Sequence, residues 1–122
     1  MKIRIQGNSI RIRLSKTEVD QLVNDGQVHE QTLFVNNSFS YSLQKKSGIN
    51  ELTANYENDL ITMFVPEEFL QNWPTNNVVG IDSTMQVSET ETLYLLLEKD
   101  FKCLDNTIED QSDNFENPNK TC

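Results

Sequence analysis

The amino-acid sequence has few of the residues that mark special classes of protein. Among its 122 residues are two cysteines, one histidine, one tryptophan, three prolines and four glycines. The two cysteines allow at most one disulfide, and in a reducing compartment we expect two free thiols. No apolar run is long enough for a membrane-spanning helix, and the first five residues alternate in polarity where a signal peptide would be apolar. We therefore expect a soluble, cytoplasmic protein.

Basic residues are scarce, above all in the second half of the chain. The sequence has 19 acidic and 10 basic residues and a net charge of −9. Residues 1–61 carry seven of each sign, whereas residues 62–122 carry three basic and twelve acidic residues. An acidic protein repels nucleic-acid phosphates and anionic membranes, so we predict neither as a partner. No phosphate-binding loop or dinucleotide motif occurs, so we predict no cofactor.

The hydrophobic pattern predicts an α+β fold in a chain whose length suits one domain. Apolar and polar residues alternate along most of the sequence, which is typical of strands with one buried face. A capped helix is predicted at about 16–25, where Ser15 and Glu18 form a capping box, and a short helix at about 66–73. We predict a curved antiparallel sheet, or a partly closed barrel, of about six to eight strands.

Composition also suggests how the chain is divided. Residues 1–101 are predicted to form a single α+β domain, and residues 102–122 an acidic C-terminal tail that can pack on that domain. The run at residues 93–97 is apolar on both faces, so we place it at the centre of the sheet. No internal repeat is apparent in the sequence.

The clearest local signal is a hairpin at the start of the chain. Gly7-Asn8 is a typical two-residue turn between two alternating segments. This turn places Arg4 opposite Arg11. It also places Lys2 opposite Arg13, so that the four cations share one face and the isoleucines share the other. Directly opposed like charges destabilise a sheet by ~0.2–1 kcal/mol per pair. The cluster therefore needs solvent, carboxylates or a bound anion to be tolerated.

Three interpretations of this cluster stay open. The long side chains can lie on a solvated face, with their stems packed on the sheet. Carboxylates of the acidic half can cover them, and the candidates are Glu98, Asp100, Asp105, Glu109, Asp110 and Asp113. Alternatively, the four cations form a site for a phosphate, a carboxylate or an acidic protein partner, with the arginines as forked donors. We take this anion-binding site as the hypothesis for function, and the sequence identifies no residue to which a catalytic role can be assigned.

Other classes of protein remain as alternatives. A curved sheet with alternating cations resembles the triphosphate-tunnel enzymes, which would imply phosphate-ester chemistry. Lys2-Ile3-Arg4-Ile5 stands here in place of the Glu-x-Glu-x-Lys start of that family. A structural protein that binds a basic partner through residues 98–118 is a further alternative. Zinc is a weaker one, because His29, Cys103 and Cys122 lack the close spacing of a metal motif.

The C-terminal stretch carries a family resemblance. It reads Asp-Phe-Lys-Cys-Leu-Asp at residues 100–105, Glu-Asp-Gln-Ser-Asp-Asn at 109–114 and Asn-Pro at 117–118. Together with the opening residues 1–11, this pattern resembles a small bacterial family of unknown function, and the likeness covers nearly the whole chain. The resemblance implies a cytoplasmic bacterial origin and a tail that belongs to the domain. It implies no activity, cofactor or partner.

Overall fold

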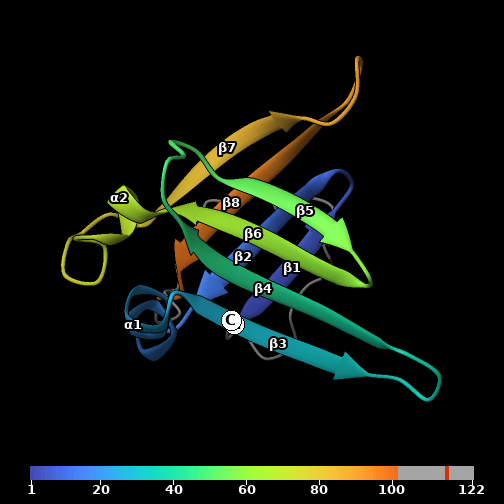
Figure 1. The fold of residues 1–122 in the computed structure, drawn as a ribbon, viewed down its shortest axis with the longest axis horizontal. Helices are drawn as coiled ribbons and strands as arrows, with labels where there is room; N and C mark the ends of the chain where they lie inside the picture. Colours follow the sequence, from blue (N-terminus) through green and yellow to red (C-terminus); the bar gives the residue numbers. More distant parts are fainter. Residues whose placement is uncertain (102–114, 116–122) are drawn as a thin grey trace.

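The computed structural model describes residues 1–101 and Phe115 (Figure 1). The rest of the predicted tail lies outside the described residues. No helix in the described part is long and apolar enough to cross a membrane. The elements, in chain order, are β1 (Lys2–Gln6), β2 (Ser9–Leu14), α1 (Lys16–Asp25), β3 (Gln27–Leu33), β4 (Ser38–Lys46), β5 (Thr53–Glu57), β6 (Leu60–Pro66), α2 (Glu67–Leu70), β7 (Gly80–Gln86) and β8 (Thr92–Lys99).

The strands form two four-stranded sheets with the core between them (Figure 1). The first sheet has the order β1-β2-β8-β7 and the second has the order β3-β4-β6-β5. Each sheet joins two antiparallel hairpins through parallel inner strands, β2 with β8 and β4 with β6. The α+β class is confirmed, but the single antiparallel sheet is wrong. The chain leaves the first sheet through α1, builds the second, and returns after α2 to set β8 beside β2. Neither sheet closes into a barrel within the described residues.

The two halves of the described chain repeat one topology. The first half runs from hairpin β1-β2 through α1 to hairpin β3-β4, and the second runs from hairpin β5-β6 through α2 to hairpin β7-β8. Exchanging the halves converts the strand order of one sheet into that of the other. The register agrees as well: Ile12 pairs with Leu97, and Met63 pairs with Leu43 at the equivalent point. The fold thus contains an internal repeat that is not apparent in the sequence.

Equivalent lysines make similar contacts in the two halves. The Nζ of Lys45 donates to the carbonyl oxygen of Val23 at 3.0 Å, in the last turn of α1. The Nζ of Lys99 donates to the carbonyl oxygen of Asn76 at 2.8 Å, in the turns that follow α2. Carbonyl groups at the end of a helix lack partners within the helix. Each lysine therefore ties the end of an inner strand to the helical segment of its half.

Helix α1 has the ends that the sequence predicts. The Ser15 side chain accepts a hydrogen bond from the backbone N–H of Glu18, and the Glu18 carboxylate accepts one from the backbone N–H of Ser15. This is the predicted capping box. Gly26 ends the helix at φ 81°, in the left-handed region that favours glycine. Its N–H donates to the carbonyl oxygen of Leu22 at 3.0 Å.

Helix α2 is shorter than predicted. It spans Glu67–Leu70, whereas the sequence suggested 66–73. Pro74 disfavours helical backbone at the residue before it, and the chain makes turns there that carry the Trp73 side chain into the core. Trp73 is fully buried, and its indole Nε1 donates to the carbonyl oxygen of Val78 at 2.9 Å.

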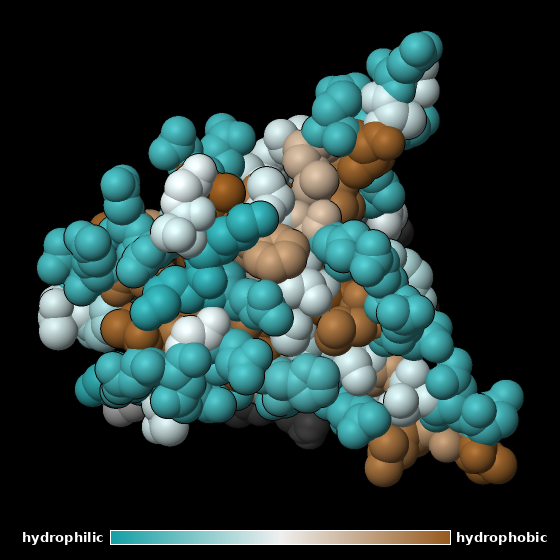
Figure 2. All heavy atoms as spheres, viewed as in Figure 1, coloured by the Kyte–Doolittle hydropathy of each residue, from teal (hydrophilic) through white to brown (hydrophobic). Residues whose placement is uncertain are grey.

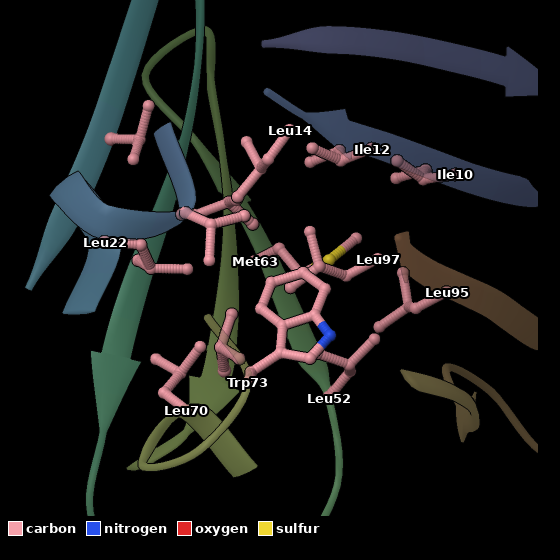
Figure 3. Close-up of a cluster of buried hydrophobic side chains, with 14 of the residues drawn as sticks. Ile10, Ile12, Leu14, Leu22, Leu52, Met63, Leu70, Trp73, Leu95 and Leu97 are labelled. Carbon is pink, nitrogen blue, oxygen red and sulfur yellow. The ribbon is translucent and has the colours of Figure 1, made fainter. Parts of the chain in front are cut away.

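The helices close one end of the space between the sheets. Leu22 of α1 and Trp73 after α2 occupy equivalent places in the two halves, and both are fully buried. They lie against inward-facing side chains of the central strands (Figure 3). The tips of hairpins β3-β4 and β7-β8 project from the opposite end (Figure 1). The fully buried side chains of the central strands include Ile12, Leu43, Met63 and Leu97.

Candidate functional site

The start of the chain forms the predicted hairpin. Strand β1 pairs with β2 in the predicted register, with Arg4 opposite Arg11 and Lys2 opposite Arg13. Gly7 adopts φ 53°, a backbone conformation that favours glycine, and this allows the tight turn that fixes the register. The isoleucines of β2 are buried on the inner side of the sheet. We term the outer surface that carries Lys2, Arg4, Arg11 and Arg13 the basic face.

Strand β8 brings a carboxylate to the basic face. It runs parallel to β2 and sets Glu98 beside Arg13. The Nε of Arg13 lies 2.7 Å from Oε1 of Glu98, and the Nε of Arg11 lies 3.7 Å from the same oxygen. Only 17% of the Glu98 side chain is exposed, so water and salt screen these ion pairs less than pairs on an open surface. Glu98 thus offsets part of the repulsion between the two arginines.

A second carboxylate contacts the end of the hairpin. The Nζ of Lys2 lies 2.8 Å from Oδ2 of Asp100. The hydrogen bond from Lys2 lowers the pKa of Asp100, and burial, which acts in the opposite direction, is the smaller effect. Glu98 and Asp100 are therefore the predicted acidic counterparts that the structure places at the basic face. The other four, Asp105, Glu109, Asp110 and Asp113, lie outside the described residues.

Two shallow hollows mark the basic face. Both include Arg4 and Arg11, whose planar guanidinium groups match the geometry of phosphate and carboxylate oxygens. The larger has a volume of about 190 Å³ and is lined by Lys2, Ile3, Arg4, Arg11 and Arg13. The smaller has a volume of about 60 Å³ and is lined by Arg4, Gln6, Ser9, Ile10, Arg11 and Tyr94.

Tyr94 and Asp82, on the neighbouring strands of the same sheet, were not predicted as part of this surface. The Tyr94 hydroxyl donates to Oδ2 of Asp82 at 2.9 Å. This hydrogen bond raises the pKa of Tyr94, and burial adds to the rise. Along β8, Tyr94 and Glu98 alternate with the fully buried Leu95 and Leu97. Side chains two residues apart along a strand share a face, so the even spacing between Tyr94 and Glu98 could have indicated that both lie on the same face of the sheet.

The described residues offer little support for the other two predicted sites, the triphosphate-tunnel site and the zinc site. In the triphosphate-tunnel alternative the cations would belong to a partly closed barrel, whereas in the described residues they lie on the outer face of an open sheet. The weak zinc alternative combined His29, which lies in β3, with Cys103 and Cys122. Both cysteines lie outside the described residues. Within the described part of the chain, no three acidic, histidine or cysteine side chains gather as metal ligands would.

A second charged cluster surrounds the Met1 amine and was not predicted. The ammonium group contacts the carboxylates of Glu18 and Glu30, the latter at 3.0 Å, and the Tyr41 hydroxyl donates to Glu30 at 2.9 Å. Burial lowers the pKa of the Met1 amine, but the hydrogen bonds to both glutamates outweigh it and raise this pKa above 8.0. Burial raises the pKa of Glu18, but hydrogen bonds from the amine and from Ser15 outweigh it and bring this pKa below 4.5.

Replacing Glu18 with glutamine is expected to lower the free energy of unfolding by about 1–3 kcal/mol at about pH 6. Glutamine can keep the capping bond, so the loss reflects the charged contact with Met1. The stabilisation by Glu18 is present above pH 4.5 and is lost as pH falls through its lower folded pKa. The stabilisation by the amine is complete below pH 8.0 and is lost as pH rises through its raised pKa.

Urea unfolding of the wild type and of Glu18→Gln, from below pH 4.5 to above pH 8.0, measures the difference in their free energies of unfolding. This difference should be largest between these two pH values and should decrease outside them. Asp20→Asn is the matched control, because Asp20 is an exposed carboxylate on the same helix. A Glu18→Gln effect that keeps one size at every pH would contradict the charged contact.

Comparison with known proteins places the chain in a family. Neither the curated proteins nor the solved structures contain a match to it. A family model does match, and it spans residues 1–119, which is nearly the whole chain. The predicted membership of an uncharacterised family is therefore confirmed. The chain belongs to the family described as Family of unknown function (DUF7009).

Proposed function

We propose that this protein binds a small molecule through an anionic phosphate or carboxylate group on the basic face. The observation that carries the proposal is the register of β1 with β2, which sets Arg4 opposite Arg11 and Lys2 opposite Arg13. Opposed cations in a sheet are unfavourable when nothing balances them. A bound oxyanion turns this arrangement into a set of charge-assisted hydrogen bonds.

The charges around the basic face support binding of an anion. Glu98 and Asp100 contact Lys2, Arg11 and Arg13. Four of the ten basic residues of the chain, which has a net charge of −9, lie together on this surface. Such a concentration of basic side chains attracts anions to the surface.

Glu98 also orients the arginines of the basic face. The contact with Glu98 holds the Nε side of Arg13 and approaches that of Arg11, which restricts how each guanidinium group is oriented. An arginine held in this way loses less conformational entropy when it binds a ligand. The hollow of about 190 Å³ over the same side chains provides space for an oxyanion group.

The proposal is tested by titrating the protein with inorganic phosphate and, separately, with citrate, against sodium chloride of equal ionic strength. Backbone amide and guanidinium NMR signals report binding. We expect shifts at Lys2, Arg4, Arg11 and Arg13, and the stronger of the two anions identifies the preferred group. The double variant Arg4→Gln/Arg11→Gln is expected to weaken binding by at least about tenfold.

Two further variants sharpen the test. Glu98→Gln removes the negative charge beside Arg11 and Arg13 but keeps a side-chain oxygen that can accept their hydrogen bonds and hold their orientation, so it should strengthen anion binding by about threefold to tenfold. Lys16→Gln removes a cation of α1 outside the basic face and should leave affinity unchanged. The proposal fails if neither anion shifts the four residues beyond the chloride control. It also fails if the double arginine variant binds as well as Lys16→Gln.

A further inference from the structure

The end of the sandwich that faces away from the helices leaves inward-facing apolar side chains uncovered. Ile5 of β1 pairs with the buried Ile10, and Tyr56 of β5 pairs with the buried Ile61, so both point toward the space between the sheets. Yet 54% of Ile5 and 60% of Tyr56 are exposed. At the other end, Leu22 and Trp73 fill this space. No described helix does so here (Figure 1).

An apolar cleft opens between the sheets at this end, with a volume of about 480 Å³. Figure 2 shows the molecule hollowed on this side, between the two projecting hairpins. Ligand sites typically have volumes of roughly 300–1,000 Å³ and mostly apolar walls. Equivalent positions of the two halves supply the walls, as three pairs: Ile5 with Tyr56, Ile10 with Ile61, and Phe39 with Leu93.

A difference between the halves contributes to the space. Ala54 lines the cleft and pairs with Met63. The equivalent residue of the first half is Ile3, which pairs with Ile12. Where one half places an isoleucine side chain between the sheets, the other places a single methyl group. Core positions of natural proteins are usually filled to crystal-like density, so an unfilled place beside exposed apolar walls points to an occupant.

The chemistry of the walls defines that occupant. None of the described residues that line the cleft carries a charge. Two of the polar side chains at its edge already have partners, because Asn8 Nδ2 donates to the carbonyl oxygen of Thr92 at 2.6 Å and Ser9 Oγ donates to that of Gln6 at 2.6 Å. A charged ligand would lose its hydration there without compensation. We infer that the cleft binds a small, neutral and largely hydrocarbon molecule, independently of the basic face.

N-phenyl-1-naphthylamine is a suitable test ligand, because it is neutral and fluoresces strongly in apolar surroundings. We expect saturable binding to the wild-type protein. Ala54→Phe places a ring inside the cleft and should weaken binding by at least about tenfold. Thr53→Phe is the matched control, since it adds the same ring to the same strand on its outer face, opposite Phe64. The control should bind as the wild type does.

Ile5→Ser provides a second variant in case Ala54→Phe folds poorly. Its side chain is more than half exposed on an edge strand, so the fold should survive while the wall becomes polar, and affinity should fall by about threefold or more. Equal affinity in wild type, Ala54→Phe and Ile5→Ser would overturn the inference. So would the absence of saturable binding to the wild type. If sedimentation velocity then shows a dimer that Ile5→Ser dissociates, a second copy of the chain is the occupant.

Discussion

Replacing Gly80 with alanine is expected to lower the free energy of unfolding by more than about 4 kcal/mol. Gly80 pairs with Glu98 across β7 and β8. A Cβ atom at this position would overlap the carbonyl oxygen of Leu97 and would lie 2.8 Å from the Cα atom of Glu98. Both are backbone atoms of an inner strand, so relief of the clash requires β7 to move away from β8. That movement breaks the ladder that completes the first sheet.

Gly48→Ala is the matched control for this prediction. Gly48 has φ 80°, and an added Cβ would meet no atom within 4 Å, so the variant isolates the cost of placing alanine in the left-handed region. We expect a loss of about 1–2 kcal/mol. Urea unfolding followed by circular dichroism compares the two variants. If Gly80→Ala loses no more stability than Gly48→Ala, the close approach of β7 to β8 is contradicted.

Trp73→Ala is expected to cost about 3–5 kcal/mol of the free energy of unfolding. The side chain is fully buried and closes the helical end of the core. Its ring centroid lies 5.0 Å from that of Phe69, and the Nζ of Lys99 lies 5.6 Å from its centroid. Truncation leaves a cavity between the two sheets and removes these contacts together. Urea unfolding and thermal unfolding both measure the loss.

Trp73→Phe separates packing from hydrogen bonding. Phenylalanine keeps an aromatic ring in the core but leaves the carbonyl oxygen of Val78 without the indole donor. We expect a loss of about 1–3 kcal/mol, well below that of the alanine variant. Similar losses in the two variants would mean that a smaller aromatic ring does not preserve the contribution of Trp73, which then depends on the indole N–H and on the full size of the indole.

Local features of the fold could be predicted from the sequence. The hairpin of β1 and β2 follows from a two-residue turn between alternating segments, and α1 follows from Ser15, Glu18 and Gly26 at its ends. Each of these depends on residues a few positions apart. The run at 93–97 was correctly placed inside a sheet, because β8 lies between β2 and β7. Its apolar residues on both faces carried that information.

The pairing of distant strands could not be predicted. Neither the sequence of β2 nor that of β8 indicates that the two strands lie side by side and parallel, because strands from different hairpins are matched by shape and burial across the whole core. The position of Glu98 beside Arg13 depends on that pairing, so the sequence offered Glu98 only as one of six candidates. The apolar cleft depends on how the two sheets face each other, and Ala54 alone gives no sign of it.

The equivalence of the two halves has a consequence for the outer faces of the two sheets. Two identical hairpin–helix–hairpin units, joined head to tail, would build the same sandwich with matching outer faces. In this chain those faces differ: Arg11 of the first sheet corresponds to the buried Thr62 of the second, and Arg4 corresponds to Asn55. One sheet thus carries cations at positions where the other carries uncharged side chains. A scaffold that is symmetric inside can therefore present two chemically different sides to its surroundings.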